Sequence, residues 1–106
     1  DASPVLLARY SAVTFNGHRI HYDRDYCQRE ENYPGLLVHG PLQATFLLRL
    51  AGRMNNDRLP GRFAFRGMSP LFDSGQFSVN AAQIDNCRHL WIRSQTAIVT
   101  MKAVAD

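Results

Sequence analysis

The fold of this chain is decided by the stretch Leu42-Gln43-Ala44-Thr45-Phe46-Leu47-Leu48-Arg49-Leu50-Ala51-Gly52-Arg53-Met54. Apolar side chains recur there every four residues, at positions 42, 46, 50 and 54, and those at positions 47, 48 and 51 widen the apolar arc. This period predicts an α-helix, the longest of the chain, and the wide arc predicts that other elements enclose it. Gly52 near its end and the polar run 55–57 supply the stop signal.

Downstream of this helix, apolar and polar residues alternate. The alternation over residues 62–66, 76–81 and 97–101, with the apolar run 90–92, predicts four antiparallel strands that each have one apolar face. Residues 73–75 (Asp-Ser-Gly) predict a hairpin turn, and residues 85–86 (Asp-Asn) break the next pair of strands. We expect the sheet to pack on Leu42, Phe46 and Leu50 of the helix. The sheet residues that we expect to be buried there are Phe63, Phe65, Phe77, Val79 and Leu90.

Upstream of the helix, the apolar and β-branched stretch 5–15 follows Pro4 and predicts a strand, which ends at Asn16-Gly17. The polar stretch 22–31 predicts a short helix and a loop, and residues 32–35 form a second break. The order is therefore strand, short helix, long apolar helix and about four antiparallel strands. This order predicts an α+β domain in which a curled antiparallel sheet wraps around one long central helix.

The composition is typical of one globular domain. The chain has 106 residues, of which 45% are hydrophobic and 20% charged, so we expect residues 1–106 to form a single domain. The net charge of +3 comes without a basic stripe interleaved with aromatic residues, which argues against nucleic-acid binding. The longest apolar runs are too short for a membrane span. Cys27 and Cys87 lack metal-ligand spacing, so we expect two reduced thiols.

The residues best suited to catalysis lie in the string Phe15-Asn16-Gly17-His18-Arg19-Ile20-His21-Tyr22-Asp23. His21 is the candidate general base, because an imidazole has a pKa close to neutrality; the alternative is a structural histidine bonded to the backbone. Asn16 can orient a water or a substrate oxygen but cannot take a proton, and it alternatively serves only the turn. His18 and His21, with Asp23 and His39, give only a weak metal-like pattern, so we expect no metal site.

A second string, Tyr33-Pro34-Gly35-Leu36-Leu37-Val38-His39-Gly40-Pro41-Leu42, leads into the long helix. Pro41 suits a first helical position, and no Ser, Thr or Asp cap precedes it, which leaves the first backbone N–H groups free for a ligand oxygen. Gly40 lets a ligand approach the backbone closely. Such N–H groups and the helix dipole suit a thioester oxygen that becomes enolate-like. The alternative is a buried helix start capped by loop carbonyls or water.

Together the two strings resemble those of the MaoC-like dehydratases of the hot-dog superfamily. That family carries Gly-Asp-x-Asn-Pro-x-His and, later, Ala-His-Gly at the start of its central helix; the matching positions here are 15–21 and 38–40. The chain is most similar to the branch of mitochondrial-type 3-hydroxyacyl-thioester dehydratases and mesaconyl-CoA hydratases. There Phe-Asn-x-His-Arg-Ile-His-Tyr-Asp and Tyr-Pro-Gly-Leu-x-Val-His-Gly-Pro-Leu are usual. Pro70-Leu71-Phe72 also fits, so the resemblance covers nearly the whole chain.

The resemblance implies a hot-dog fold and a hydro-lyase, which hydrates a 2-enoyl thioester or dehydrates a 3-hydroxyacyl thioester of coenzyme A or acyl carrier protein. It implies His21 as the base and the Gly40 amide as the oxyanion donor, with His39 and His18 in substrate binding. The catalytic Asp of the family falls at Asn16, so we expect His21 to be the sole base and Asn16 to position the water. No cofactor or metal is expected.

The resemblance also implies a partner domain, because hot-dog sheets pair edge to edge and two domains line each site. We therefore expect a homodimer or a second hot-dog domain, which makes residues 1–106 a candidate second half of a longer double hot-dog protein. The expected location is a bacterial cytoplasm or the mitochondrial matrix, without nucleic-acid or membrane partners. Two alternatives remain open. One is a hot-dog thioesterase, against which the lack of Asp and Glu in the long helix argues; the other is a non-catalytic structural half.

Overall fold

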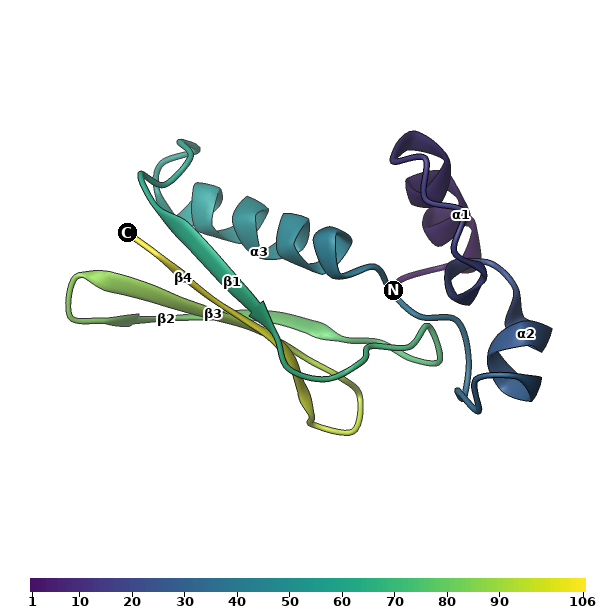
Figure 1. Cartoon of the computed structure of the whole chain (residues 1–106). Helices are drawn as coiled ribbons and strands as arrows, with labels where there is room; N and C mark the ends of the chain where they lie inside the picture. Colours follow the sequence, from purple (N-terminus) through teal and green to yellow (C-terminus); the bar gives the residue numbers. More distant parts are fainter. The chain divides into compact units, whose positions relative to one another are not determined.

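The computed structural model describes residues 1–106 and divides them into two compact units. The first unit comprises residues 1–39 and 70–76, and the second comprises residues 40–69 and 77–106. Figure 1 labels their α-helices and strands. In chain order the elements are α1 (Pro4–Val13), the 3-10 helix η1 (Arg19–His21), α2 (Arg24–Arg29), α3 (Gly40–Met54), β1 (Phe63–Gly67), β2 (Ser78–Ile84), β3 (Cys87–Arg93) and β4 (Val99–Ala105).

The second unit is a four-stranded antiparallel sheet with α3 packed against it (Figure 1). The strand order is β1-β4-β3-β2, and every neighbouring pair is antiparallel. A two-residue turn at Asp85-Asn86 joins β2 to β3, with Asp85 in the left-handed region at φ 55°. The predicted α+β class, the long helix with its end at Met54 and the four antiparallel strands are confirmed.

The most deeply buried face of α3 is shifted from the predicted stripe. The row Gln43, Leu47 and Ala51 is buried, whereas positions 46 and 50 of the predicted stripe are half-buried and Met54 is 38% exposed. Gln43 is the reason that hydrophobicity alone misplaced this face. Its Oε1 accepts a hydrogen bond from the buried hydroxyl of Thr100 at 2.9 Å, so a polar residue is accommodated within the core.

The predicted sheet core is correct at its centre and wrong at its edge. Leu90 is buried, and the ring of Phe77 lies 5.6 Å from that of Phe46 on α3. Phe65, however, is 53% exposed. It pairs across the strands with the buried Ala103, so it shares the inner face, but β1 is an edge strand and leaves its ring partly uncovered. The remaining predicted positions, Phe63 and Val79, are half-buried.

In the first unit, the strand predicted over residues 5–15 is wrong, because these residues form helix α1. The hydroxyl of Ser3 accepts the N–H of Leu6 at 3.1 Å, and Pro4 occupies the first helical position. A Ser cap followed by Pro is a strong helix start, and it outweighs the strand preference of the two valines in this stretch. The short polar helix was predicted correctly: Asp23 caps α2 by accepting the N–H of Tyr26 at 3.0 Å.

The predicted hairpin at residues 73–75 is also wrong. Strands β1 and β2 lie at opposite edges of the sheet, and the segment between them, residues 70–76, belongs to the first unit. Phe72 forms an antiparallel bridge with Leu37. The carboxylate of Asp73 accepts the N–H of Leu36 at 3.0 Å and is paired with Arg24 at 2.5 Å. Its side chain is 2% exposed, so this residue anchors the segment that leads to residue 39.

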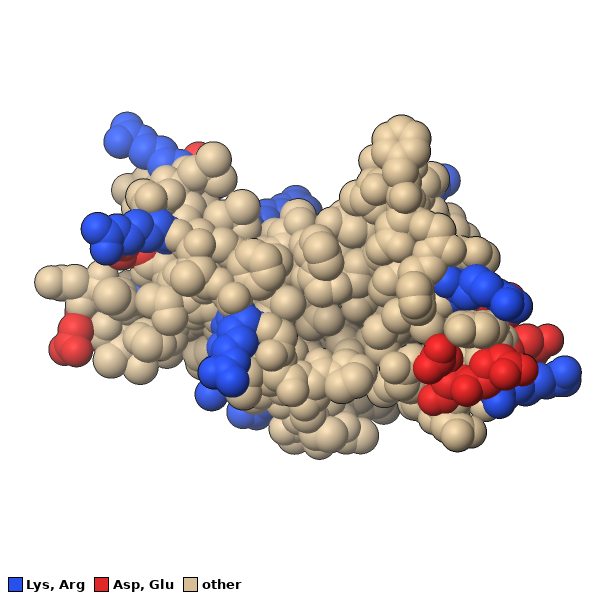
Figure 2. Space-filling model, in the orientation of Figure 1, with Lys and Arg blue, Asp and Glu red and all other residues tan.

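Charged side chains are distributed unevenly over the surface. In the view of Figure 2 the Lys and Arg side chains stand apart from one another, whereas acidic side chains gather in the region of α2. The exposed carboxylates in and after that helix are Asp25, Glu30 and Glu31. None of the helices combines the length and the apolar character that a membrane crossing requires.

Candidate functional site

The first unit brings the two sequence strings together at a cluster of histidines. His21 ends η1, and His39 is the last residue of the unit before α3. Their imidazole rings stack with centroids 3.7 Å apart and an angle of 15° between the planes. The ring of His18 lies 6.1 Å from that of His21. Three of the residues that the sequence singled out therefore lie within one small volume.

His21 is held in one tautomer by the backbone. Its Nδ1 lies 2.8 Å from the carbonyl oxygen of Leu37, and a carbonyl can only accept, so Nδ1 carries the proton. In the neutral ring Nε2 therefore bears the lone pair. The side chain is 7% exposed, and burial lowers the pKa of His21, partly opposed by the hydrogen bond to Leu37. A neutral imidazole with a free Nε2 is the form that a general base requires.

Asn16 builds the loop that precedes His21. Its Oδ1 accepts the backbone N–H of His18 at 3.0 Å, and the hydroxyl of Tyr22 donates to the carbonyl of Gly17 at 3.1 Å. These two bonds tie the turn to η1, so Asn16 has a structural task in the chain. The same Oδ1 bond can be made by a carboxylate, so the loop geometry is compatible with an aspartate at this position.

His39 is enclosed by α1, the helix that the sequence analysis did not predict. Its Nε2 lies 2.8 Å from the hydroxyl of Ser11, and the ring of Tyr10 packs against it edge-on with centroids 4.7 Å apart. The side chain is 1% exposed, and its Nδ1 is buried with no hydrogen-bond partner. Burial, with a smaller contribution from the neighbouring His21, lowers the pKa of His39 to about 4, so this ring is neutral at physiological pH.

Gly40, the expected oxyanion donor, is the first residue of α3 and belongs to the second unit. A Cβ placed on Gly40 would meet no atom within 4 Å, so the backbone at the helix start has open space beside it. The first turn of α3 contains no acidic residue. Both properties suit the binding of an electron-rich oxygen at this helix start.

The side chains form neither a metal-binding group nor a site with a reactive thiol. No group of three or more His, Cys, Asp or Glu side chains is arranged to hold a metal ion. The thiol of Cys27 is buried and donates to the carbonyl of Ile20 at 3.2 Å, and burial raises its pKa above the ordinary value. A protonated thiol of this kind is a poor nucleophile.

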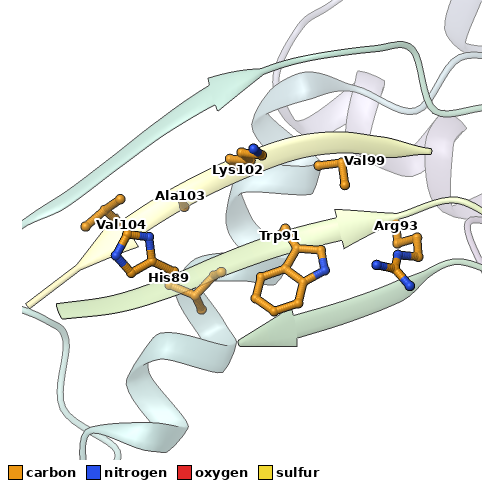
Figure 3. A pocket seen from close by; sticks show the side chains of 8 residues that line it. His89, Trp91, Arg93, Val99, Lys102, Ala103 and Val104 are labelled. Atoms are coloured by element: carbon orange, nitrogen blue, oxygen red, sulfur yellow. The ribbon is translucent and has the colours of Figure 1, made fainter. Parts of the chain in front are cut away.

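The sheet carries a hollow of its own, with a volume of about 360 Å³, in the second unit (Figure 3). In Figure 3 the side chains of Trp91 on β3 and Lys102 on β4 stand on the same face, and these residues are cross-strand partners. The lining includes one histidine, His89, and no carboxylate, hydroxyl or thiol. This hollow therefore lacks the stacked pair of imidazoles that the histidine cluster of the first unit provides.

The sequence of the chain matches the family model of hydroxyacyl-thioester dehydratase type 2 over residues 1–73. This match includes the whole histidine cluster. The chain belongs to this dehydratase family. As a family member it is 55% identical over 78 residues to mesaconyl-C(4)-CoA hydratase of Chloroflexus aurantiacus, which covers 74% of this chain and 28% of that protein. It is 35% identical over 92 residues to the mitochondrial hydroxyacyl-thioester dehydratase type 2 of Schizosaccharomyces pombe. That match covers 85% of this chain and 30% of the Schizosaccharomyces pombe protein.

Solved structures confirm the hot-dog fold for this member of the dehydratase family. The (R)-hydratase of A. caviae involved in PHA biosynthesis superposes with a TM-score of 0.80 at 16% identity, covering 97% of this chain and 84% of that one. HtdX of Mycobacterium tuberculosis superposes with a TM-score of 0.78 at 20% identity, covering 96% of this chain and 43% of the other. The chain spans less than a third of the length of the two curated relatives.

Proposed function

We propose that this chain supplies the catalytic domain of a hydro-lyase, which hydrates a 2-enoyl thioester or dehydrates a 3-hydroxyacyl thioester. The observation that carries the proposal is His21, a buried neutral imidazole whose Nδ1–H is fixed on the Leu37 carbonyl and whose Nε2 is left as a base. Membership of the dehydratase family and the names of both relatives support the same chemistry.

In the proposed mechanism one histidine moves one proton twice. Nε2 of His21 removes a proton from water while the water oxygen bonds to C3 of the enoyl group. The electron pair of the C2–C3 double bond moves onto the thioester carbonyl, and the N–H of Gly40 stabilises the resulting enolate oxygen. The imidazolium then returns its proton to C2, which restores the carbonyl and the neutral base. Asn16 positions the water, and His18 binds the acyl thioester near the loop.

A single base is sufficient for this cycle, because the proton taken from water is the one delivered to C2. The cycle is therefore compatible with Asn16, whose amide cannot take a proton. The scheme requires that the water and Nε2 of His21 lie on the same face of the C2–C3 double bond, so the addition is syn. Dehydration follows the same steps in reverse.

We further propose that residues 1–106 make up one hot-dog domain that works beside another, as the second half of a longer chain or as a homodimer. The coverage of relatives supports this, since one chain of HtdX contains more than twice the length matched here. The substrate is an acyl-CoA or an acyl carrier protein thioester; the mesaconyl-CoA hydratase relative favours CoA. The named relatives come from a bacterium and from mitochondria, which supports a cytoplasmic or matrix location.

The test is hydration of crotonyl-CoA and of a mesaconyl-CoA thioester by the intact protein, followed by the loss of enoyl-thioester absorbance. Free thiol is measured in the same reactions. Loss of the enoyl signal without thiol release is expected. Thiol release would instead indicate a thioesterase, which the absence of Asp and Glu from α3 argues against. No turnover, together with no thermal shift by crotonyl-CoA beyond that of CoA alone, would indicate a non-catalytic half.

A further inference from the structure

His39 is held more tightly than a substrate-binding side chain needs to be. The Ser11 hydroxyl lies 2.8 Å from Nε2, the edge-on ring of Tyr10 lies 4.7 Å away, and the side chain is 1% exposed. Both neighbours come from α1, so this helix fixes the position of the ring. With so little exposed surface, His39 is a poor candidate for direct contact with a thioester.

The face of His39 lies against the base. The two rings are 3.7 Å apart and within 15° of parallel, so His39 covers one face of the His21 imidazole. The hydrogen bond from Nδ1 to the Leu37 carbonyl fixes the rotation of the His21 ring within its plane, and the stack fixes the plane itself. Together the two contacts determine the direction of the Nε2 lone pair.

The unpartnered nitrogen of His39 shows that simple core packing does not account for this residue. Nδ1 is buried and has no hydrogen-bond partner, which is unfavourable for a polar atom. A hydrocarbon side chain would fill the space without that disadvantage. An imidazole, however, is flat enough to stack on His21 and also offers Nε2 to Ser11.

We propose that Ser11 and His39 form a positioning pair, in which Ser11 holds the His39 ring and His39 holds the ring of the base His21 in its reactive orientation. This inference rests on the proposed function and gives His39 a different task from the substrate contact expected from the sequence. Neither residue of the pair exchanges a proton with substrate. Their effect on the reaction passes through the orientation and the solvation of His21.

The electrostatics of the cluster are consistent with this task. The neighbouring ring of His18 contributes to lowering the pKa of His21, and the ring of His21 contributes to lowering the pKa of His39. Burial is the largest influence on both rings and lowers both pKa values. If the His39 ring is no longer held in place, water reaches the face of His21 that His39 otherwise covers. The pKa of His21 then rises toward its ordinary value of 6.5.

The experiment compares Ser11→Ala with Ser3→Ala in the intact protein. Both substitutions remove a hydroxyl from the α1 region, but the hydroxyl of Ser3 caps the helix by accepting the N–H of Leu6, whereas that of Ser11 binds His39. Ser3→Ala therefore reports the effect of a weakened α1 alone. For each variant we measure kcat and KM for crotonyl-CoA across pH, and we follow the titration of the His21 ring by NMR.

Ser11→Ala is expected to lower kcat about tenfold with little change in KM, because a small misorientation of a catalytic group slows chemistry more than binding. The acid limb of its pH profile should move to higher pH, since the base must be neutral and its pKa has risen. The His21 titration should move in the same direction. Ser3→Ala should lower Tm and leave kcat, its pH profile and the NMR titration of His21 unchanged.

Equal kcat and pH profiles for Ser11→Ala and the wild type would overturn the positioning role, as would the same kinetic loss in Ser3→Ala. An inactive wild-type protein would instead overturn the proposed function. In that case the His21 titration still decides the positioning role, because it needs no turnover: an unchanged titration in Ser11→Ala would refute it.

Discussion

Replacement of Asp73 should destabilise the first unit through the loss of two interactions that can be measured separately. Its carboxylate accepts the N–H of Leu36 at 3.0 Å and pairs with Arg24 at 2.5 Å, and the side chain is 2% exposed. Asp73→Ala leaves the buried Leu36 N–H without a partner, which costs about 1–3 kcal/mol. It also removes the partner of Arg24, but that side chain is 45% exposed and can hydrate, so we add only about 1 kcal/mol or less.

The expected loss for Asp73→Ala is therefore about 1–4 kcal/mol in the free energy of unfolding. Asp73→Asn keeps an acceptor for Leu36 and should lose only the ion pair, about 1 kcal/mol or less. Urea melts of the intact protein followed by circular dichroism measure both. Because the single tryptophan, Trp91, lies in the sheet of the second unit, its fluorescence is not a suitable probe of the first unit.

Hydrogen exchange at the Leu36 amide gives the local readout. It should speed up strongly in Asp73→Ala and only slightly in Asp73→Asn. If the two variants lost the same small amount, below about 0.5 kcal/mol, and the Leu36 amide kept its protection, the reasoning about this anchor would be refuted.

Two further substitutions test neighbouring features. Gly35→Ala should cost about 1–3 kcal/mol of unfolding free energy, because its Cβ would lie 2.6 Å from the Asp73 Oδ1. The control Gly67→Ala, whose Cβ would meet nothing within 4 Å, should change stability by less than about 0.5 kcal/mol. Equal urea midpoints for the two variants would contradict this. Asn16→Asp should keep the loop conformation, since a carboxylate can still accept the N–H of His18. The variant should hydrate crotonyl-CoA at least as fast as the wild type. A large decrease in kcat would show that the amide of Asn16 is required.

The sequence was most informative where a pattern is local. The i+4 period predicted α3, and alternation predicted the strands, because both depend on residues close together in the chain. The strand predicted over residues 5–15 was wrong for a local reason as well: the Ser3-Pro4 signal for a helix start was present and outweighed the apolar content. Attention to that cap would have predicted α1 and placed Ser11 on a helix.

Other features depend on contacts between distant residues, which no local pattern reveals. Ser11 and His39 are 28 positions apart, and Arg24 and Asp73 are 49 apart. The hydrogen bond between Gln43 and Thr100 joins residues 57 positions apart, and it explains why the buried face of α3 is shifted. For the site, the sequence identified His21 and His39 from their motifs, but it could not show that their rings stack.

The most direct test of the account is kcat for crotonyl-CoA hydration by His21→Ala in the intact protein, measured beside the wild type. Circular dichroism must first show that the variant is folded, because the ring of His21 is buried and bonded to Leu37. If His21 is the sole base, kcat should fall by roughly 10²–10⁴-fold. Turnover close to that of the wild type in a folded His21→Ala protein would contradict the central claim.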